Sequence, residues 1–178
     1  MAASGRLATE GITPMLVSAD ERCFRATGTD TDATDLAPLS RSGARYDRPG
    51  GPQNLYASRR QHVAHAELER RAGVGIARCR ITTIQVKALL LDAYTREGLL
   101  RLGLRRGDLV QADKIVCREL AEMARASSAS GLLVPSAAVD DELNVVIWRE
   151  AVPEVVRVLN WRIASTDDLS KEPTDSGG

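Results

Sequence analysis

The stretch Ser40-Arg41-Ser42-Gly43-Ala44-Arg45-Tyr46-Asp47-Arg48-Pro49-Gly50-Gly51 is the most informative part of this sequence. A short apolar run, Leu55-Tyr56-Ala57, follows it, and a stretch of helical character that carries Glu67 comes next. Glycines, arginines, aromatic rings and a carboxylate therefore fall within about one supersecondary unit. A ligand that combines phosphates, sugar rings and a flat base needs this mixture of side chains, so we expect a binding loop here.

The composition is that of one globular domain with no excess of charge. The chain has 178 residues, 43% of them hydrophobic and 27% charged, which is enough for a real core. Its 24 basic residues equal its 24 acidic ones. This balance argues against a nucleic-acid-binding protein, because binding to the phosphate backbone usually requires a basic excess. Arginine outnumbers lysine, but for most of these arginines a solvated surface is the simpler interpretation.

The cysteines and histidines indicate neither disulfides nor a metal. Cys23, Cys79 and Cys117 are scattered, without a CxxC motif, and are expected to be reduced thiols. His62 and His65 are the only histidines, so no zinc site is expected. No apolar run reaches the ~20 residues that span a bilayer, and the N-terminus lacks the features of a signal peptide. We therefore expect a cytoplasmic protein without membrane contact.

The periodicity of the sequence divides the chain into three parts. Residues 1–18 are expected to form a loosely ordered arm, residues 19–164 the folded domain, and residues 165–178 a disordered tail. Strands are predicted over 22–26, 54–57, 76–86, 132–134, 144–148 and 155–163, helices over 58–71 and 112–124, and short helical turns over 89–104. The mixture of strands and few helices predicts the α+β class.

Both predicted helices have an expected buried side. Ser58 is the expected N-cap of the first helix and Gly73 marks its end. The residues expected to be buried are Ala64, Ala66 and Leu68 in the first helix and Ala112, Val116, Leu120, Met123 and Ala124 in the second.

Glu67 is the first candidate for chemistry. A glutamate on a helix is usually only a solvated charge, and Glu69 is an equally placed competitor. If the small side of the helix at Ala64 is buried, Glu67 would be drawn toward a cleft. A carboxylate there could stabilise the oxocarbenium-like ribose of a glycosidic cleavage.

Three arginines could bind an anion. Arg25, in the first predicted strand, is either an edge-strand charge or an anchor for a pyrophosphate through its planar guanidinium. Arg45 and Arg48 could serve in the same way, because the glycines around them would let the backbone approach a ligand closely.

The aromatic residues and one serine complete the candidates. Tyr46, Tyr56 and Trp148 either pack in the core or stack on a flat base, and Trp161 is expected in the core. Ser136, at a strand end, is either a turn residue or a hydrogen-bond donor to a ligand. No GxSxG, GxGxxG or Walker A motif is present, which excludes a serine-hydrolase nucleophile and NAD binding of the Rossmann kind.

Taken together, these segments resemble the RES domain, over about residues 22–150. The segments that carry the resemblance are Phe24-Arg25, Ser42 to Gly50, Leu55 to Ser58, Ala64 to Glu67, Gly131 to Ser136 and Asn144 to Ile147. The family is named for an Arg, a Glu and a Ser, which match Arg25, Glu67 and Ser136.

The resemblance extends to the loop, with two departures. Arg45 and Tyr56 match further pocket positions of the family. Asp47 stands where the family often has Asn, and Ala44 where a second Gly is common.

The resemblance implies an activity and a partner. RES-domain proteins are toxins of bacterial type II toxin–antitoxin systems, with a fold like that of ADP-ribosyltransferases. They deplete NAD by cleaving the nicotinamide–ribose bond, with water or phosphate as acceptor and without a metal. Their partner is an antitoxin with an Xre-type helix-turn-helix, and the toxins are commonly homodimers within the assembly. NAD and such an antitoxin are therefore the expected ligand and partner.

The resemblance also implies roles for the matched residues. Arg25 and Arg45 would hold the pyrophosphate or the adjoining ribose, and Tyr56 would pack beside the nicotinamide. Glu67 would bond to ribose hydroxyls and stabilise the positive charge that develops, while Ser136 would fix the pose or Glu67.

Three roles and two other functions stay open. Tyr46 and Trp148 are further candidates for the NAD pocket without a defined role, and His62 has none assigned. The alternatives are a protein ADP-ribosyltransferase, which would use the same pocket, and a non-enzymatic interaction module. A nucleic-acid-binding module ranks last.

Overall fold

The computed structural model describes residues 11–36, 44–48, 50, 51 and 53–170. Its elements are, in chain order, β1 (Leu16–Thr27), β2 (Leu55–Ser58), α1 (Gln61–Ala72), β3 (Arg78–Asp92), α2 (Arg96–Arg101), α3 (Arg106–Val110), α4 (Ile115–Ala126), β4 (Gly131–Pro135), β5 (Leu143–Ile147), α5 (Val152–Val155), β6 (Val156–Ser165) and α6 (Thr166–Ser170). The predicted α+β class is confirmed. The first ten residues of the predicted arm, part of the glycine-rich loop and residues 171–178 of the predicted tail lie outside the described residues.

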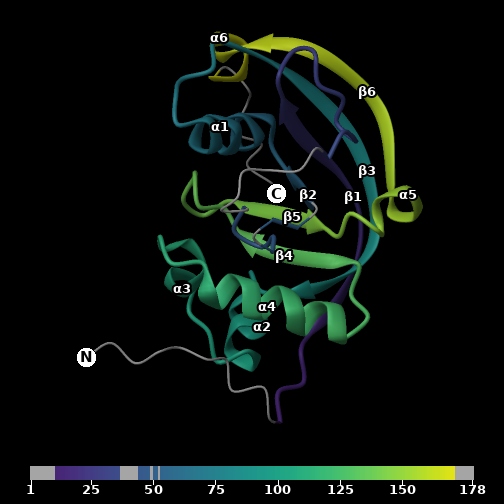
Figure 1. Cartoon of the computed structure of the whole chain (residues 1–178), viewed down its shortest axis with the longest axis vertical. Helices are drawn as coiled ribbons and strands as arrows, with labels where there is room; N and C mark the ends of the chain where they lie inside the picture. Colours follow the sequence, from purple (N-terminus) through teal and green to yellow (C-terminus); the bar gives the residue numbers. More distant parts are fainter. Residues whose placement is uncertain (1–10, 37–43, 49, 52, 171–178) are drawn as a thin grey trace, which may run out of the picture.

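The strands β1, β2, β5, β4 and β3 form a closed ring, because β1 pairs with both β2 and β3. β6 extends the sheet beyond the ring as the second partner of β3. The neighbouring strands are antiparallel except for β3 and β4, which are parallel. In Figure 1, β2, β5 and β4 lie side by side between α1 and α4, and the long strands β1, β3 and β6 curve around them.

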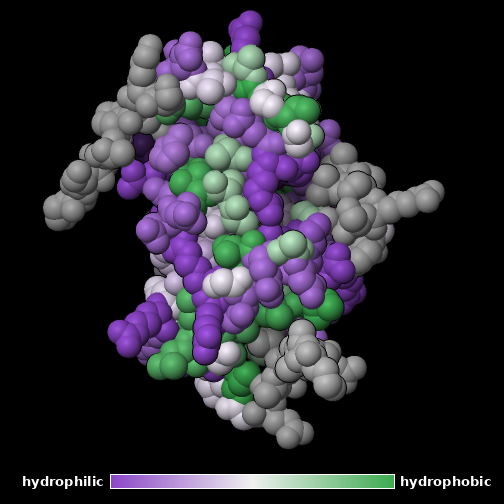
Figure 2. All heavy atoms as spheres, turned by 90° about the vertical axis from the view of Figure 1, so that its left-hand side faces the viewer, coloured by the Kyte–Doolittle hydropathy of each residue, from purple (hydrophilic) through white to green (hydrophobic). Residues whose placement is uncertain are grey.

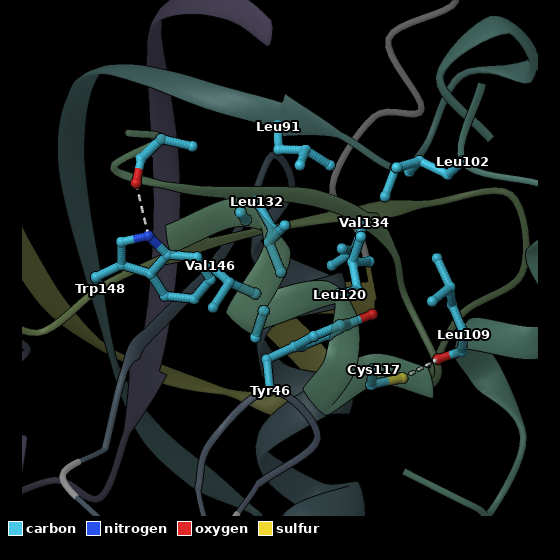
Figure 3. Close-up of a cluster of buried hydrophobic side chains, with 14 residues drawn as sticks. Tyr46, Leu91, Leu102, Leu109, Cys117, Leu120, Leu132, Val134, Val146 and Trp148 are labelled. Carbon is cyan, nitrogen blue, oxygen red and sulfur yellow. Dashed lines mark hydrogen bonds between the residues drawn. The ribbon is translucent and has the colours of Figure 1, made fainter. Parts of the chain in front are cut away.

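Alternate residues of the short strands face opposite sides of the sheet. Residues of one parity, among them Leu55, Leu133 and Val145, are buried inside the ring with residues of β1 and β3. Residues of the other parity, including Leu132 and Val146, face outward and pack against α2, α3 and α4, as Figure 3 shows. The outer face of β2, β5 and β4 is therefore the surface against which α2, α3 and α4 pack.

A third apolar cluster joins α6 and the long strands to α1. Ala64 of α1 and Leu169 of α6 pack there with Cys79, Ile81 and Ala164 of the long strands. The prediction of a disordered tail from residue 165 is wrong for α6. Leu169 is the physical reason, because burial of its side chain anchors a helix in a segment whose composition is polar.

Long-range strand pairing moves several predicted boundaries. β1 begins at Leu16, inside the predicted arm, because it pairs with β3 along its whole length. β3 continues to Asp92 and takes the place of the first helical turns predicted over 89–104. α4 begins only at Ile115, so Ala112 is not part of its buried side, which is formed by Cys117, Leu120, Ala121 and Ala124.

The predicted N-cap of α1 is wrong, whereas its predicted end is confirmed. Its N-cap is Arg60, without a side-chain capping bond, and not Ser58. Ser58 is the last residue of β2, where strand pairing holds its backbone extended. The end at Gly73 is confirmed, since this residue has a φ of 72°, a left-handed conformation that glycine adopts without strain.

Trp161 was expected in the core, and this prediction is wrong. Its side chain lies on β6 and is 55% exposed, and the guanidinium carbon of Arg80 lies 4.1 Å from the ring centroid. A position on the strand at the edge of the sheet explains the difference, because most of the neighbouring side chains of β6 are exposed as well. In the described part of the chain, no helix has the length and apolar character needed to cross a membrane.

Candidate active site

A cavity of about 390 Å³ lies on the outer face of β2, β5 and β4, between α1 and the segment that leads into α4. This volume lies within the usual range for small-molecule sites. The residues that line it are Ala44, Arg45, Tyr46, Tyr56, Ser58, Ala64, Glu67, Arg70, Arg71, Lys114, Val134, Pro135, Ala137 and Asn144.

Strand and helix periodicity place these residues on one surface. Tyr56 and Ser58 are two apart on β2, so both face outward, opposite to the buried Leu55. Ala64 and Glu67 are three apart on α1 and therefore share the side of the helix that faces the cavity. The small side chain of Ala64 is buried, as expected, and this brings Glu67 close to the sheet.

Three donors converge on one oxygen of the Glu67 carboxylate. Oε1 accepts hydrogen bonds from the Ser136 hydroxyl at 2.7 Å, from the Ala137 backbone N–H at 3.1 Å and from the Asn144 side-chain amide at 2.7 Å. Oε2 receives none of these three bonds. The carboxylate is thus held through one oxygen, and Glu67 is one of the residues that line the cavity.

Ser136 acts on Glu67 from behind the cavity wall. Only 2% of its surface is exposed. Its hydroxyl donates to Glu67 and accepts from the backbone N–H groups of Ala138 and Val139, both at 3.1 Å. These acceptor bonds fix the direction in which the hydroxyl hydrogen points. The structure therefore brings the two predicted residues, Glu67 and Ser136, into direct contact.

Several residues of the site were not predicted from the sequence. They are Arg70, Arg71 and Lys114 of the lining, Ala137 through its backbone, and the pair Asn144 and Ser58. Asn144 donates to Glu67, and its side-chain oxygen accepts a 2.5 Å hydrogen bond from the Ser58 hydroxyl. The two residues are partners in the pairing of β2 with β5. A polar residue at the end of each of two apolar strands was the signal in the sequence, but only their pairing reveals its meaning.

Glu69, the competitor of Glu67, has a structural role. Its carboxylate accepts a hydrogen bond from the backbone N–H of Ile76 at 2.9 Å. Its other oxygen, Oε2, lies 3.7 Å from Nδ1 of His65. These contacts tie the end of α1 to the segment that enters β3.

The two tyrosines of the cavity are hydrogen-bonded to each other, and Asp47 holds the hydroxyl of Tyr56. The Tyr56 hydroxyl donates to Asp47 at 3.0 Å and accepts from the backbone N–H of Tyr46 at 3.1 Å. Asn54 also donates to Asp47, from its backbone and its side chain. Burial raises the pKa of both tyrosine hydroxyls well above the ordinary value and also raises the pKa of Asp47. Both rings therefore offer neutral aromatic surface to the cavity.

Arg45 lines the cavity, but its guanidinium is bound to backbone. It donates to the carbonyl oxygens of Gln111 at 2.5 Å and Val110 at 3.4 Å. These carbonyls belong to the end of α3, which Arg45 thereby attaches to the glycine-rich loop. The arrangement makes Arg45 a support of the cavity wall.

Arg25 is buried at the end of the ring and does not line the cavity. Its guanidinium donates to the Tyr56 carbonyl at 3.3 Å, and its Nε is a buried donor without a partner among the described residues. Burial lowers the pKa of Arg25 to about 10, and the nearby charge of Arg71 acts in the same direction. The residue thus lies beneath the strand that carries Tyr56.

Two further candidates lie outside the cavity. Trp148 is 3% exposed, packs in the cluster of Figure 3 and donates its indole N–H to the Ala129 carbonyl at 2.7 Å. Arg48 is exposed and forms an ion pair with Glu122 of α4. Both residues therefore have structural contacts in place of a position at the site.

Basic side chains predominate among the charges of the cavity. Arg45, Arg70, Arg71 and Lys114 contribute positive charge, and Glu67 is the acidic residue of the described lining. Figure 2 shows a face on which hydrophilic side chains surround small hydrophobic patches. Among the described residues, no group of three or more His, Cys, Asp or Glu side chains is arranged to hold a metal. The site thus suits an anionic ligand that also carries a flat ring.

The sequence profile of the RES domain matches residues 21–170. The chain belongs to the RES domain family. Arg25, Glu67 and Ser136 all fall within this RES domain, which also includes α6. No curated protein matches the sequence of the RES domain described here.

The fold of this RES domain also occurs in a solved structure. It is similar to a chain in the crystal structure of the M. tuberculosis MbcT–MbcA toxin–antitoxin complex, with a TM-score of 0.71. The two chains are 23% identical, over 84% of this chain and 87% of that chain. At this identity the likeness establishes a shared fold.

Proposed function

We propose that this RES domain is the toxin of a toxin–antitoxin pair and that it depletes NAD by cleaving the nicotinamide–ribose bond. The observation that carries the proposal is the Glu67 carboxylate, which three donors hold through one oxygen at the wall of a basic, tyrosine-lined cavity. Membership of the RES family and the fold shared with a chain of a toxin–antitoxin complex support it.

In the proposed reaction, Glu67 stabilises the sugar as the leaving group departs. The bond between the ribose C1′ and the nicotinamide nitrogen breaks, and its electron pair leaves with nicotinamide, which becomes neutral. Positive charge develops on the ribose, and the Glu67 carboxylate opposes it electrostatically through Oε2, the oxygen that receives none of these three bonds. An oxygen of water or phosphate then bonds to C1′, and the acceptor's proton passes to solvent.

Three basic residues of the cavity lining would hold the diphosphate. Arg70, Arg71 and Lys114 line the cavity and can form charge-assisted hydrogen bonds with phosphate oxygens. This assignment differs from the one implied by resemblance, because the guanidinium of Arg45 is bound to carbonyls and Arg25 lies beneath β2. Arg25 would support the site through the backbone of Tyr56.

The tyrosines would bind the flat part of the substrate. Tyr46 and Tyr56 both line the cavity. Burial raises the pKa of their hydroxyls, so both stay neutral and offer mainly ring surface. Trp148 would contribute only through the packing beneath the site.

The partner would be an antitoxin of the Xre helix-turn-helix type that covers the cavity. We further propose that the RES domain forms a homodimer within this assembly and acts in the cytoplasm.

The test follows NAD loss and nicotinamide release by the purified chain, separated from any partner, with and without phosphate. We expect turnover by the unmodified protein and a loss of about 10²–10³-fold in Glu67→Gln, as for removal of one electrostatic contact with a transition state. Glu97→Gln, at an exposed glutamate of α2 paired with Arg101, is the matched control and should keep full activity.

Each outcome assigns a different function. Dependence on phosphate would name phosphate as the acceptor. Transfer of labelled ADP-ribose to protein, with little free product, would replace the proposal by protein ADP-ribosylation. If the protein neither consumes NAD nor binds it, the result would indicate an interaction module. Equal rates in Glu67→Gln and the parent would overturn the role of Glu67.

A further inference from the structure

We infer that Asn144 and Ser58 are positioning residues, which hold Glu67 in its working orientation through a chain of hydrogen bonds from β2 through β5 to α1. The inference rests on the function proposed for Glu67. Its basis is the pair of contacts from Ser58 to Asn144 at 2.5 Å and from Asn144 to Glu67 at 2.7 Å.

The direction of each bond in this chain follows from chemistry. An ionised carboxylate can only accept, so Asn144 must present its amide nitrogen to Glu67. The amide oxygen of Asn144 then faces Ser58, whose hydroxyl must donate. The reverse orientation of the amide would place two acceptors against each other. Each member of the chain therefore determines the orientation of the next.

Because Ser58 and Asn144 are buried, their hydrogen bonds can hold Glu67 in one orientation. Ser58 is 2% exposed and Asn144 is 7% exposed, so the loss of one partner leaves a buried polar atom unsatisfied. Strand pairing places the two residues opposite each other, and their backbones cannot move independently. The side chains are thus held by the sheet, whereas Glu67 belongs to α1. The chain of bonds fixes the helix residue relative to the sheet that forms the floor of the cavity.

Asn144→Asp is the most informative variant. Near neutral pH it would place a second carboxylate against Glu67, and repulsion would displace Glu67. As the pH falls, the pair of carboxylates would share one proton, and a donor toward Glu67 would be restored. We therefore expect kcat for NAD cleavage to fall roughly 100-fold near neutral pH and to recover partly in acid. The other charged groups that line the same cavity are Arg45, Arg70, Arg71 and Lys114, and they are identical in both proteins.

Ser58→Ala removes the first donor in this series of hydrogen bonds, and it is a smaller change than Asn144→Asp. Loss of the hydroxyl leaves the Asn144 oxygen without its donor, so we expect kcat to fall about 10-fold and KM to change by less than about threefold. The controls are Ser127→Ala, which removes one hydroxyl at the end of α4, and Asn160→Asp, at an exposed position of β6. Both controls should keep the parent's kcat and pH profile.

A measurement without substrate separates this inference from the proposed function. In ¹⁵N-labelled protein, Glu67→Gln should shift the side-chain amide resonances of Asn144, and Ser58→Ala should shift them as well. Unshifted resonances in both variants would overturn the inference, whether or not the protein consumes NAD. If the parent cleaves NAD, an Asn144→Asp variant with the parent's rate and pH profile would also overturn it. A parent without NAD turnover would refute the proposed function alone, and the resonances would still decide the contact.

Discussion

At the scale of single residues, the site is built around the unequal treatment of the two oxygens of Glu67. One oxygen accepts three hydrogen bonds and the other accepts none of them. The donors come from three different places in the chain: a strand end, the backbone next to it, and the neighbouring strand. Such an arrangement holds a carboxylate in one orientation before a ligand arrives, which lowers the cost of reorganisation during a reaction.

Removal of the Ser136 hydroxyl should weaken this arrangement without destroying it. In Ser136→Ala the carboxylate keeps its bonds to Ala137 and Asn144 but loses the 2.7 Å bond from the hydroxyl. We expect kcat for NAD cleavage to fall roughly 10- to 100-fold, with a smaller change in KM. Steady-state kinetics beside Ser130→Ala, on the turn before β4, would measure this. A Ser136→Ala variant with full activity would contradict the role of the hydroxyl.

Asp47→Asn should stabilise the protein, and the gain should depend on pH. The Oδ2 atom of Asp47 is buried and has no hydrogen-bond partner in the described part of the chain, and burial raises the pKa of the carboxyl. A raised folded-state pKa means that stability is fully present below the unfolded pKa and is lost as the pH rises through the folded value. Asparagine carries no such charge, so the variant should be more stable above that pKa by on the order of 1 kcal/mol.

Urea unfolding at several pH values measures the difference. The gain of Asp47→Asn over the parent should shrink as the medium becomes acidic. Asp30→Asn, at an exposed position of the loop after β1, should show little change at any pH. A gain that grew toward acid would have the wrong sign for this explanation.

At the scale of elements, the close approach of β4 and β5 is what places Ser136 beside Asn144. Gly131 makes this approach possible at the start of β4. A Cβ at this position would collide with the backbone carbonyl of Val146 on the neighbouring strand. The clash involves backbone, which cannot move without disturbing the pairing of β4 with β5.

Gly131→Ala should therefore destabilise the protein by about 3 kcal/mol, at the upper end of the usual cost of overpacking. Gly107→Ala, on α3, is the control, because a Cβ there would meet no atom within 4 Å. Denaturant midpoints of the two variants decide the matter. Equal midpoints would mean that β4 and β5 can separate more easily than their pairing suggests.

At the scale of the whole molecule, α6 joins segments from both ends of the described chain. Leu169 is 2% exposed in a cluster that includes Ala26 of β1, Ala64 of α1 and Ala164 of β6. Ala64 also lines the cavity, so the same cluster supports α1 beside the site. The stability of α1, and hence the position of Glu67, therefore depends on a segment at the end of the domain.

Leu169→Ala should lower the free energy of unfolding by about 2–5 kcal/mol, as for other buried leucines. Leu100→Ala makes the same chemical change at a side chain that is 76% exposed, and should have little effect. Thermal unfolding of both variants provides the comparison. If Leu169→Ala unfolded like the parent, α6 would not be part of the cooperative domain.

The sequence determined the class of fold, most of the elements and the identity of the central residues. Local patterns were sufficient for these. The β-branched run of β3, the apolar spacing in α4 and the glycine after α1 each report on neighbours only a few residues away. The motifs that resemble the RES domain also identified Glu67 and Ser136, which the structure brings together at 2.7 Å.

Only the tertiary structure decided what these residues contact. The sequence could not show that Asn144 and Ser58 stand opposite each other, that Arg45 binds carbonyls 65 and 66 residues away, or that Trp148 is core and Trp161 is exposed. It also could not extend β1 to Leu16 or assign α6. The physical reason is common to all of these cases. Strand pairing and burial join segments far apart in the chain, and their free energy outweighs the local preferences that a sequence displays.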